Sequence, residues 1–161
     1  MRDSTAGFDR QNWRPGMTTG ICGLPIPQRI LELIEAGRWK MPSDPVILGR
    51  CFPSFAAPDE VIGPRFYTVD EMCREPKSWL QATLAPTGSH TEPVAKQSEQ
   101  LHPKQIILIG DVGIGWDAPI ALDFTEVKAV PRVIHLAWIN RAPGWIQIAS
   151  DIDLFIALLR L

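Results

Sequence analysis

The last third of the chain, residues 106–161, is the most informative part of the sequence for predicting the fold. In it, apolar runs alternate with turn residues, and the chain then ends in an amphipathic segment with helical spacing. Residues 106–109 are apolar, mostly β-branched, and show no alternation, which predicts a strand covered on both faces. Further apolar runs predict strands at 119–124, 133–138 and 145–148. The segment therefore predicts a self-contained sheet.

The same segment predicts a hairpin in this sheet and a helix that packs on it. Proline followed by glycine at 143–144 is typical of a type II turn, so the last two predicted strands should pair as a hairpin. After Ser150, the expected cap of a terminal helix, apolar residues recur at the spacing of one helix face. They are Ile152, Phe155, Ile156 and Leu159, and the stripe is widened by Leu154, Leu158 and Leu161. The helix should dock on the sheet, and truncation after Ser150 should abolish soluble folding.

The N-terminal half predicts an arm, a helix and a loop. Residues 1–20 lack periodicity and are expected to form a flexible N-terminal arm. Pro27 suits the first turn of a helix that should end near Gly37. Recurring prolines predict an extended loop over 41–64, with one short edge strand at 46–48.

The middle of the chain contains a clear helix start. Thr68 and Glu71 match a capping box, in which each side chain binds the backbone N–H of the other residue, so a helix should begin at Val69. A proline then breaks it, and a second short helix is expected over 77–84. The polar residues 85–104 follow no pattern and are expected to form a mobile surface loop.

Length and composition favour one cytoplasmic domain, expected over 21–161. The 16 Lys and Arg residues are scattered and the net charge is −2, which argues against direct nucleic-acid binding. No apolar run approaches the roughly 20 residues that span a bilayer, and the N-terminus has no apolar signal-peptide region. The cysteines form no CxxC pair, which fits reduced, buried or half-buried thiols. They are Cys22, Cys51 and Cys73.

A glycine-rich stretch invites a nucleotide-binding interpretation, but its details oppose one. Gly110, Gly113 and Gly115 follow the reverse of the dinucleotide fingerprint, and a predicted strand follows them where the fingerprint needs a helix. The Gly-Lys-Ser/Thr of a phosphate-binding loop is absent from the sequence. We therefore expect these glycines to form a hairpin turn at positive φ.

Other chemically active side chains also favour structural roles. Asp111, Asp117 and Asp123 are evenly spaced but lack the ligand pattern of a calcium loop, so turn and strand-end roles are expected. His135 lies inside a predicted strand, where a hydrogen-bonded structural histidine is expected. The sequence contains no G-x-S-x-G nucleophile motif and no H-E-x-x-H metal motif. We expect no enzyme, metal or cofactor; a small-molecule-binding or hydrolytic domain is an alternative.

Two short segments supply candidates for binding a protein partner. Trp116 lies at the expected tip of the glycine turn beside Asp117, and an exposed aromatic next to a carboxylate is typical of an interface anchor. Alternatively, Trp116 folds back over the sheet. If it is the anchor, Trp116→Ala should weaken partner binding by at least about 2 kcal/mol. The candidates are Asp111, Trp116 and Asp117 at the turn, with Arg65 and Tyr67 before the middle helix.

A fixed order of short motifs runs from Leu24 to Leu161. LPIPQRILELIEAG matches a leading Leu-Pro helix and FYTVDEM a capped middle helix. The motifs that follow are Ile109-Gly110 with Gly113, then Leu122-Asp123, then Trp145, and last Ser150 and Phe155 in the terminal helix. This order resembles the SUKH superfamily, the Smi/Knr-like proteins. The proline-rich stretch 41–64 and the loop 85–104 depart from the family pattern.

The resemblance implies a single α+β domain whose mainly antiparallel sheet is packed by helices, with amphipathic helices at both ends. Many bacterial members look like immunity proteins that bind and neutralise a cognate toxin domain, whereas fungal members are regulatory scaffolds. We therefore expect a non-catalytic protein-binding domain, an immunity protein, with a regulatory scaffold as the alternative. The sequence pI of about 5.9 suits a basic partner such as a nuclease toxin. An immunity gene should directly follow a toxin gene.

Overall fold

A five-stranded antiparallel sheet with strand order β3-β4-β5-β6-β7 forms the centre of the molecule. The computed structural model describes residues 20–21, 23–52, 64–74, 101–112, 118–125, 130–139 and 142–161. The strands are β3 (Arg65–Phe66), β4 (Ile106–Asp111), β5 (Pro119–Asp123), β6 (Arg132–Ile139) and β7 (Ala142–Ala149). Each strand pairs antiparallel with the next in the chain. The predicted α+β class with a mainly antiparallel sheet is confirmed.

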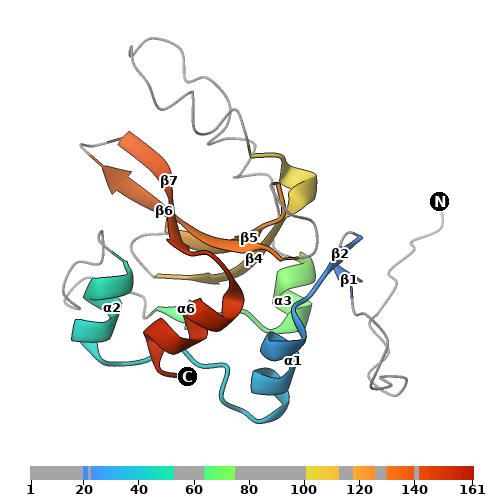
Figure 1. Ribbon diagram of the computed structural model, residues 1–161, viewed down its shortest axis with the longest axis horizontal. Helices are drawn as coiled ribbons and strands as arrows, with labels where there is room; N and C mark the ends of the chain where they lie inside the picture. Colours follow the sequence, from blue (N-terminus) through green and yellow to red (C-terminus); the bar gives the residue numbers. More distant parts are fainter. Residues whose placement is uncertain are drawn as a thin grey trace.

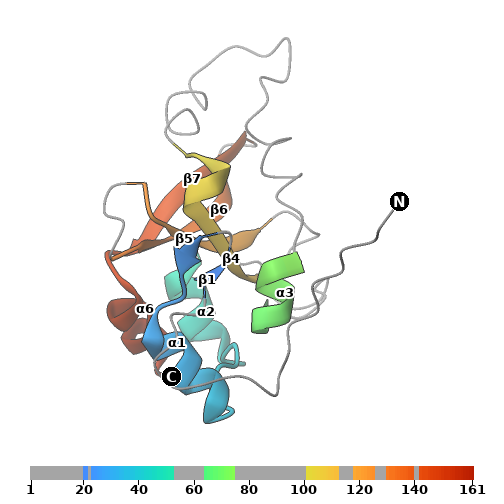
Figure 2. The ribbon, with the colours of Figure 1, turned by 90° about the vertical axis from the view of Figure 1, so that its right-hand side faces the viewer.

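Helices pack mostly on one side of this sheet. In Figure 1, α1, α2 and α6 lie together below the sheet, and α3 lies beside β4, an arrangement that Figure 2 shows from the side. The helices are α1 (Gln28–Glu35), α2 (Pro45–Cys51), α3 (Val69–Arg74), the 3-10 helix η3 (Pro103–Gln105) and α6 (Ile152–Leu159). A separate two-stranded ladder joins β1 (Gly20–Ile21) to β2 (Leu24–Pro25). None of the helices in the described ranges is long and apolar enough to cross a membrane.

The core lies between the sheet and α6. Every residue of 106–110 in β4 is buried, as the unbroken apolar run predicts. On α6 the predicted face is buried, and Phe155 is fully enclosed. Leu154 and Leu158 are 45% and 43% exposed, so the prediction that they widen the buried stripe is wrong. This short helix rests on the sheet through one face, and these leucines lie outside that face.

The β6–β7 hairpin is confirmed, but its predicted turn is misplaced. Pro143 and Gly144 belong to β7 and pair with Trp138 and Ala137 of β6. Gly144 is not at positive φ, which position three of a type II turn requires. Within the described chain β7 is the last strand of the sheet, and a sheet edge tolerates a proline because no neighbouring strand needs its missing N–H.

The predicted edge strand at 46–48 is wrong, because these residues form part of α2. Asp44 caps the helix by accepting a hydrogen bond from the Val46 N–H at 2.8 Å, and Pro45 occupies the first turn. An aspartate followed by a proline is therefore the start signal that decides this segment. The helix α1 begins after Pro27 as predicted, and Gly37 follows its end at a φ of 66°.

Three other boundaries differ from the prediction. The cap of α6 is Asp151, which accepts from the Leu154 N–H at 2.8 Å, while the Ser150 hydroxyl donates to the Asp151 carboxylate. Gly20 of the expected arm is part of β1. Residues 101–104 of the expected mobile loop are described: Leu101 is buried, and Pro103 and Lys104 belong to η3. The helix predicted at 77–84 and the rest of the arm and loop lie outside the described residues.

Candidate functional site

Two of the predicted partner-binding residues meet at one end of the sheet. Arg65 of β3 and Asp111 of β4 are register partners, and Asp111 is in turn paired with Pro119 of β5. Just beyond them the Val112 N–H donates to the Ala118 carbonyl oxygen at 3.1 Å. The other candidates at the turn, Trp116 and Asp117, lie outside the described residues, as do Gly113 and Gly115.

Gly110 allows the strand that carries Arg65 to approach. It lies in β4 opposite Phe66 at a register irregularity, and it is not at positive φ, so its predicted role in a turn is wrong. A Cβ at this position would lie 2.7 Å from the Arg65 carbonyl oxygen and 2.9 Å from Cδ1 of Phe66. Only glycine leaves room for this close approach of two backbones.

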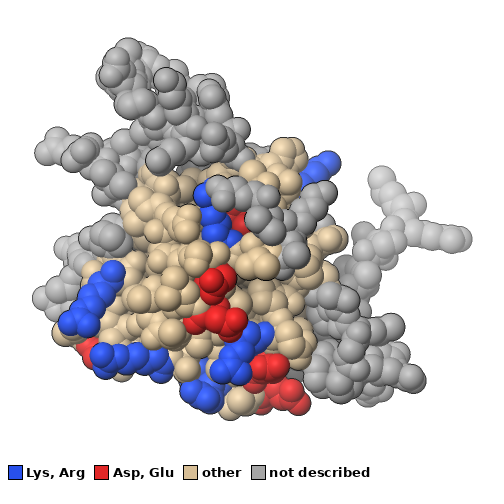
Figure 3. Space-filling model, in the orientation of Figure 1, with Lys and Arg blue, Asp and Glu red and all other residues tan. Residues whose placement is uncertain are grey.

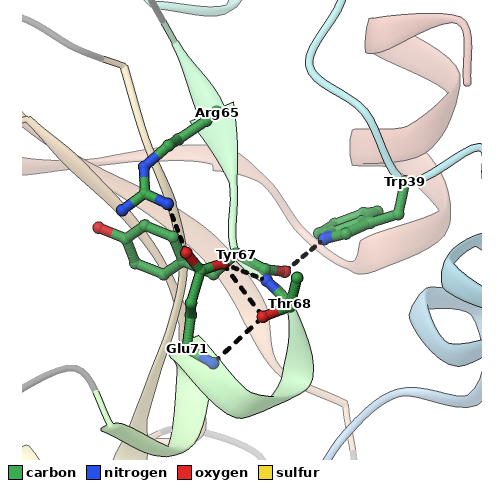
Figure 4. A network of polar contacts seen from close by, with 5 residues as sticks. All are labelled: Trp39, Arg65, Tyr67, Thr68 and Glu71. Atoms are coloured by element: carbon green, nitrogen blue, oxygen red, sulfur yellow. Dashed lines mark hydrogen bonds and ion pairs between the residues drawn. The ribbon is translucent and has the colours of Figure 1, made fainter. Parts of the chain in front are cut away.

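The capping box of α3 extends into an ionic network at the surface (Figure 4). The Thr68 N–H donates to Glu71 Oε2 at 2.8 Å, and the Glu71 N–H donates to Thr68 Oγ1 at 3.3 Å, which confirms the predicted box. The second carboxylate oxygen of Glu71 accepts from Arg65 Nη1 at 2.6 Å. The Arg65 guanidinium also lies 4.9 Å from the centre of the Tyr67 ring. The box that starts the helix therefore also orients an arginine.

Buried aromatic groups hold this network in place. Tyr67 is 5% exposed, so its ring supports Arg65 and offers little surface of its own. Trp39 Nε1 donates to the Tyr67 carbonyl oxygen at 3.1 Å, and the Trp39 ring stacks on Phe66 with centroids 4.1 Å apart. The Tyr67 N–H donates to the carbonyl oxygen of Ile109 in β4 at 2.9 Å. The junction between β3 and α3 is therefore fixed from both sides.

The charges of the network remain at the surface. The Arg65 and Glu71 side chains are 51% and 36% exposed. The pKa of Glu71 is lowered, chiefly because its carboxylate accepts from the Thr68 N–H; slight burial opposes this shift, and the hydrogen bond and charge of Arg65 add to it. The carboxylate is therefore ionised at neutral pH. The arrangement can offer an oriented guanidinium to the carboxylate or carbonyl groups of a partner.

His135 and Asp123 have structural contacts, as predicted. His135 is fully buried and its Nδ1 lies 3.2 Å from the Pro119 carbonyl oxygen, which can only accept, so Nδ1 carries the proton. Burial lowers the pKa of His135 to about 4, although this hydrogen bond opposes the shift. Asp123 is buried at the end of β5, where it forms an ion pair with Arg132 at 2.8 Å and accepts from the Thr125 N–H.

The remaining reactive side chains are dispersed. Among the described residues no group of three or more His, Cys, Asp or Glu side chains is placed to hold a metal ion. Cys51 is buried, and burial raises the pKa of its thiol, so the thiol stays protonated at neutral pH. Cys73 is exposed, unlike the buried or half-buried thiol predicted, and Cys22 lies outside the described residues.

Trp39 is the part of the site that sequence reasoning misses. Its indole meets the Tyr67 backbone from 28 positions away in the chain, and no local spacing signals that contact.

Comparison with protein-family models, with curated proteins and with solved structures found no match for this chain.

Proposed function

We propose that the chain is a non-catalytic protein-binding domain, an immunity protein that neutralises a cognate bacterial toxin domain in the cytoplasm. The observation that carries this proposal is the exposed guanidinium of Arg65, held by Glu71 and by the ring of Tyr67. Arginine is enriched among the residues that dominate protein interfaces. A side chain that is already held in its binding conformation loses less entropy when a partner docks.

The neighbourhood of Arg65 supports an interface at this end of the sheet. Asp111 lies opposite Arg65 on β4 and is half-buried, so side chains of both charge signs lie on paired strands. Val112 and Ala118, which flank the candidates Trp116 and Asp117 in the chain, are joined at the same end. Binding here would neutralise a toxin by covering its active site. The pI of about 5.9 favours fast association with a basic toxin, such as a nuclease.

A growth assay tests the proposal with a defined partner. The C-terminal domain encoded by the gene directly upstream is expressed with and without this chain, and growth is followed. We expect the domain alone to stop growth and co-expression to restore it. Purified Arg65→Ala should bind that domain at least about ten-fold more weakly than the wild type, because the variant loses the oriented guanidinium.

Arg29→Ala is the matched control for this experiment. Arg29 also forms an exposed ion pair, with Glu32 at 3.0 Å, and the two side chains are 49% and 47% exposed. This pair lies on α1 and takes no part in the network drawn in Figure 4, so the control should bind like the wild type. The proposal fails if the wild type neither binds the upstream domain nor protects against it, a result that would favour a regulatory scaffold instead.

A further inference from the structure

A groove lies at the edge of the sheet opposite β3, between β7, α2 and α6. It has a volume of about 430 Å³ and is lined by apolar side chains from all of these elements together with two arginines. Its principal lining residues are Ile47, Arg50, Ile146, Ile148, Leu158 and Arg160. Since β3 and β7 are the outer strands of the described sheet, this groove is separate from the Arg65 site.

The groove carries positive charge from two arginines. Arg50 and Arg160 line it, and none of the described residues that line it is an Asp or a Glu. Over the described ranges neither arginine forms an ion pair. Figure 3 shows two basic side chains over this lower left part of the molecule with a small acidic area between them, whereas the larger acidic areas lie near the centre and at the lower right. The groove is therefore complementary to an acidic ligand.

Arg160 occupies a backbone position that glycine would adopt with less strain. It ends α6 in the left-handed conformation at a φ of 58°, the only non-glycine residue of the described chain with a positive φ. Glycine usually occupies this position because it has no Cβ to strain. A strained residue with a charged side chain at the rim of a groove points to a use for that charge.

The edge of β7 offers backbone groups to a partner. In the described sheet β7 pairs only with β6, and Gln147 in its middle is exposed. Pro143 has no N–H, so any further pairing is confined to the strand beyond it. Leu158 on the groove wall is 43% exposed and offers an apolar contact. A strand that pairs on one side only within the described sheet, beside an apolar wall, suits the addition of an extended strand.

We propose that the groove binds an extended acidic segment of a partner protein. The segment adds to β7 through backbone hydrogen bonds, places its carboxylates on Arg50 and Arg160, and packs an apolar side chain on Leu158. This second interaction surface goes beyond the toxin-binding site proposed above and does not depend on it, because the two lie at opposite edges of the sheet.

The test uses two acetylated and amidated peptides of the eight-residue length of β7. One alternates valine with aspartate, and the other alternates valine with lysine. Fluorescence anisotropy on the full chain should show the aspartate peptide binding at least about ten-fold more tightly, with affinity that falls between about 0.1 M and 1 M salt. Amide NMR shifts caused by the peptide should centre on 144–149.

Variants at the two arginines complete the design. Arg50→Ala and Arg160→Gly should each weaken binding of the aspartate peptide at least about five-fold. Arg160→Gly should also keep or raise the melting temperature, since it removes the strain, so a loss of binding would not reflect unfolding. Arg29→Ala, which leaves the groove intact, should change nothing.

Several outcomes would overturn the proposal. Equal binding of both peptides, no binding of either, or peptide-induced shifts centred on Arg65 would each exclude an acidic strand at β7. So would concentration-dependent self-association through 144–149 in the absence of peptide, because the edge would then serve a second copy of the chain.

Discussion

At the residue scale, the candidate site depends on individual side chains, and the sequence predicts the contacts of some of them but not of others. The capping box of Thr68 and Glu71 is visible in the sequence because its partners are three positions apart. The attachment of Arg65 to that box is not, because the arginine comes from the preceding strand. The role of Gly110 in close packing cannot be predicted from the sequence either, because it depends on the pairing of β4 with β3.

Gly110→Ala should destabilise the fold by about 1–3 kcal/mol, because the added methyl group meets the Arg65 backbone and the Phe66 ring. Gly144→Ala is the matched control in another strand of the sheet, since its Cβ would meet no atom within 4 Å. The control should change the free energy of unfolding by less than about 0.5 kcal/mol. Urea denaturation of both variants measures the difference, and equal effects would refute the role given to Gly110.

His135 should make stability depend on pH in a defined window. Its pKa of about 4 in the folded protein lies below the ordinary histidine value of 6.5, so the unfolded chain binds more protons between these values. Stability is therefore highest above pH 6.5 and should fall as the pH drops. Between pH 7 and pH 5 the free energy of unfolding should decrease by about 2 kcal/mol, as measured by urea denaturation. His135→Gln should remove most of this decrease; an unchanged slope would contradict the assignment.

At the scale of elements, hydrophobic periodicity predicts most of the C-terminal third. The strands and the buried face of α6 agree with their predicted positions because apolar spacing determines which face meets the core. The errors arise where two local signals compete. Pro143-Gly144 resembles a turn but lies at a sheet edge, and the apolar 46–48 resembles a strand but follows the capping residue Asp44.

Alanine substitutions at Phe155 and Leu154 test which face of α6 packs on the sheet. Phe155 is fully buried against the rings of Phe52 and Phe66, so Phe155→Ala should cost about 3–5 kcal/mol. Leu154, its neighbour on the same helix, is 45% exposed, so Leu154→Ala should cost less than about 1 kcal/mol. Thermal denaturation followed by circular dichroism measures both. Similar losses would mean that the helix docks through a different face.

At the scale of the whole molecule, the sheet separates two surfaces of different character. The β3 edge carries an ion pair supported by aromatic rings, and the β7 edge carries a basic, partly apolar groove. The sequence predicts β4 to β7 and the helices α1, α3 and α6, but it misassigns α2 and does not predict the contacts that build either surface. Each surface joins side chains from distant segments, such as Trp39 with Tyr67 and Arg50 with Arg160.

Hydrogen exchange of the chain with and without the upstream-encoded domain tests the central proposal most directly. Docking at the Arg65 site should slow exchange of the backbone amides in 64–74 and 109–112, because the partner covers β3, the start of α3 and the end of β4. Protection in these segments should be lost in Arg65→Ala and kept in Arg29→Ala. A partner that binds but leaves both segments unprotected would contradict the assignment of the interface to this end of the sheet.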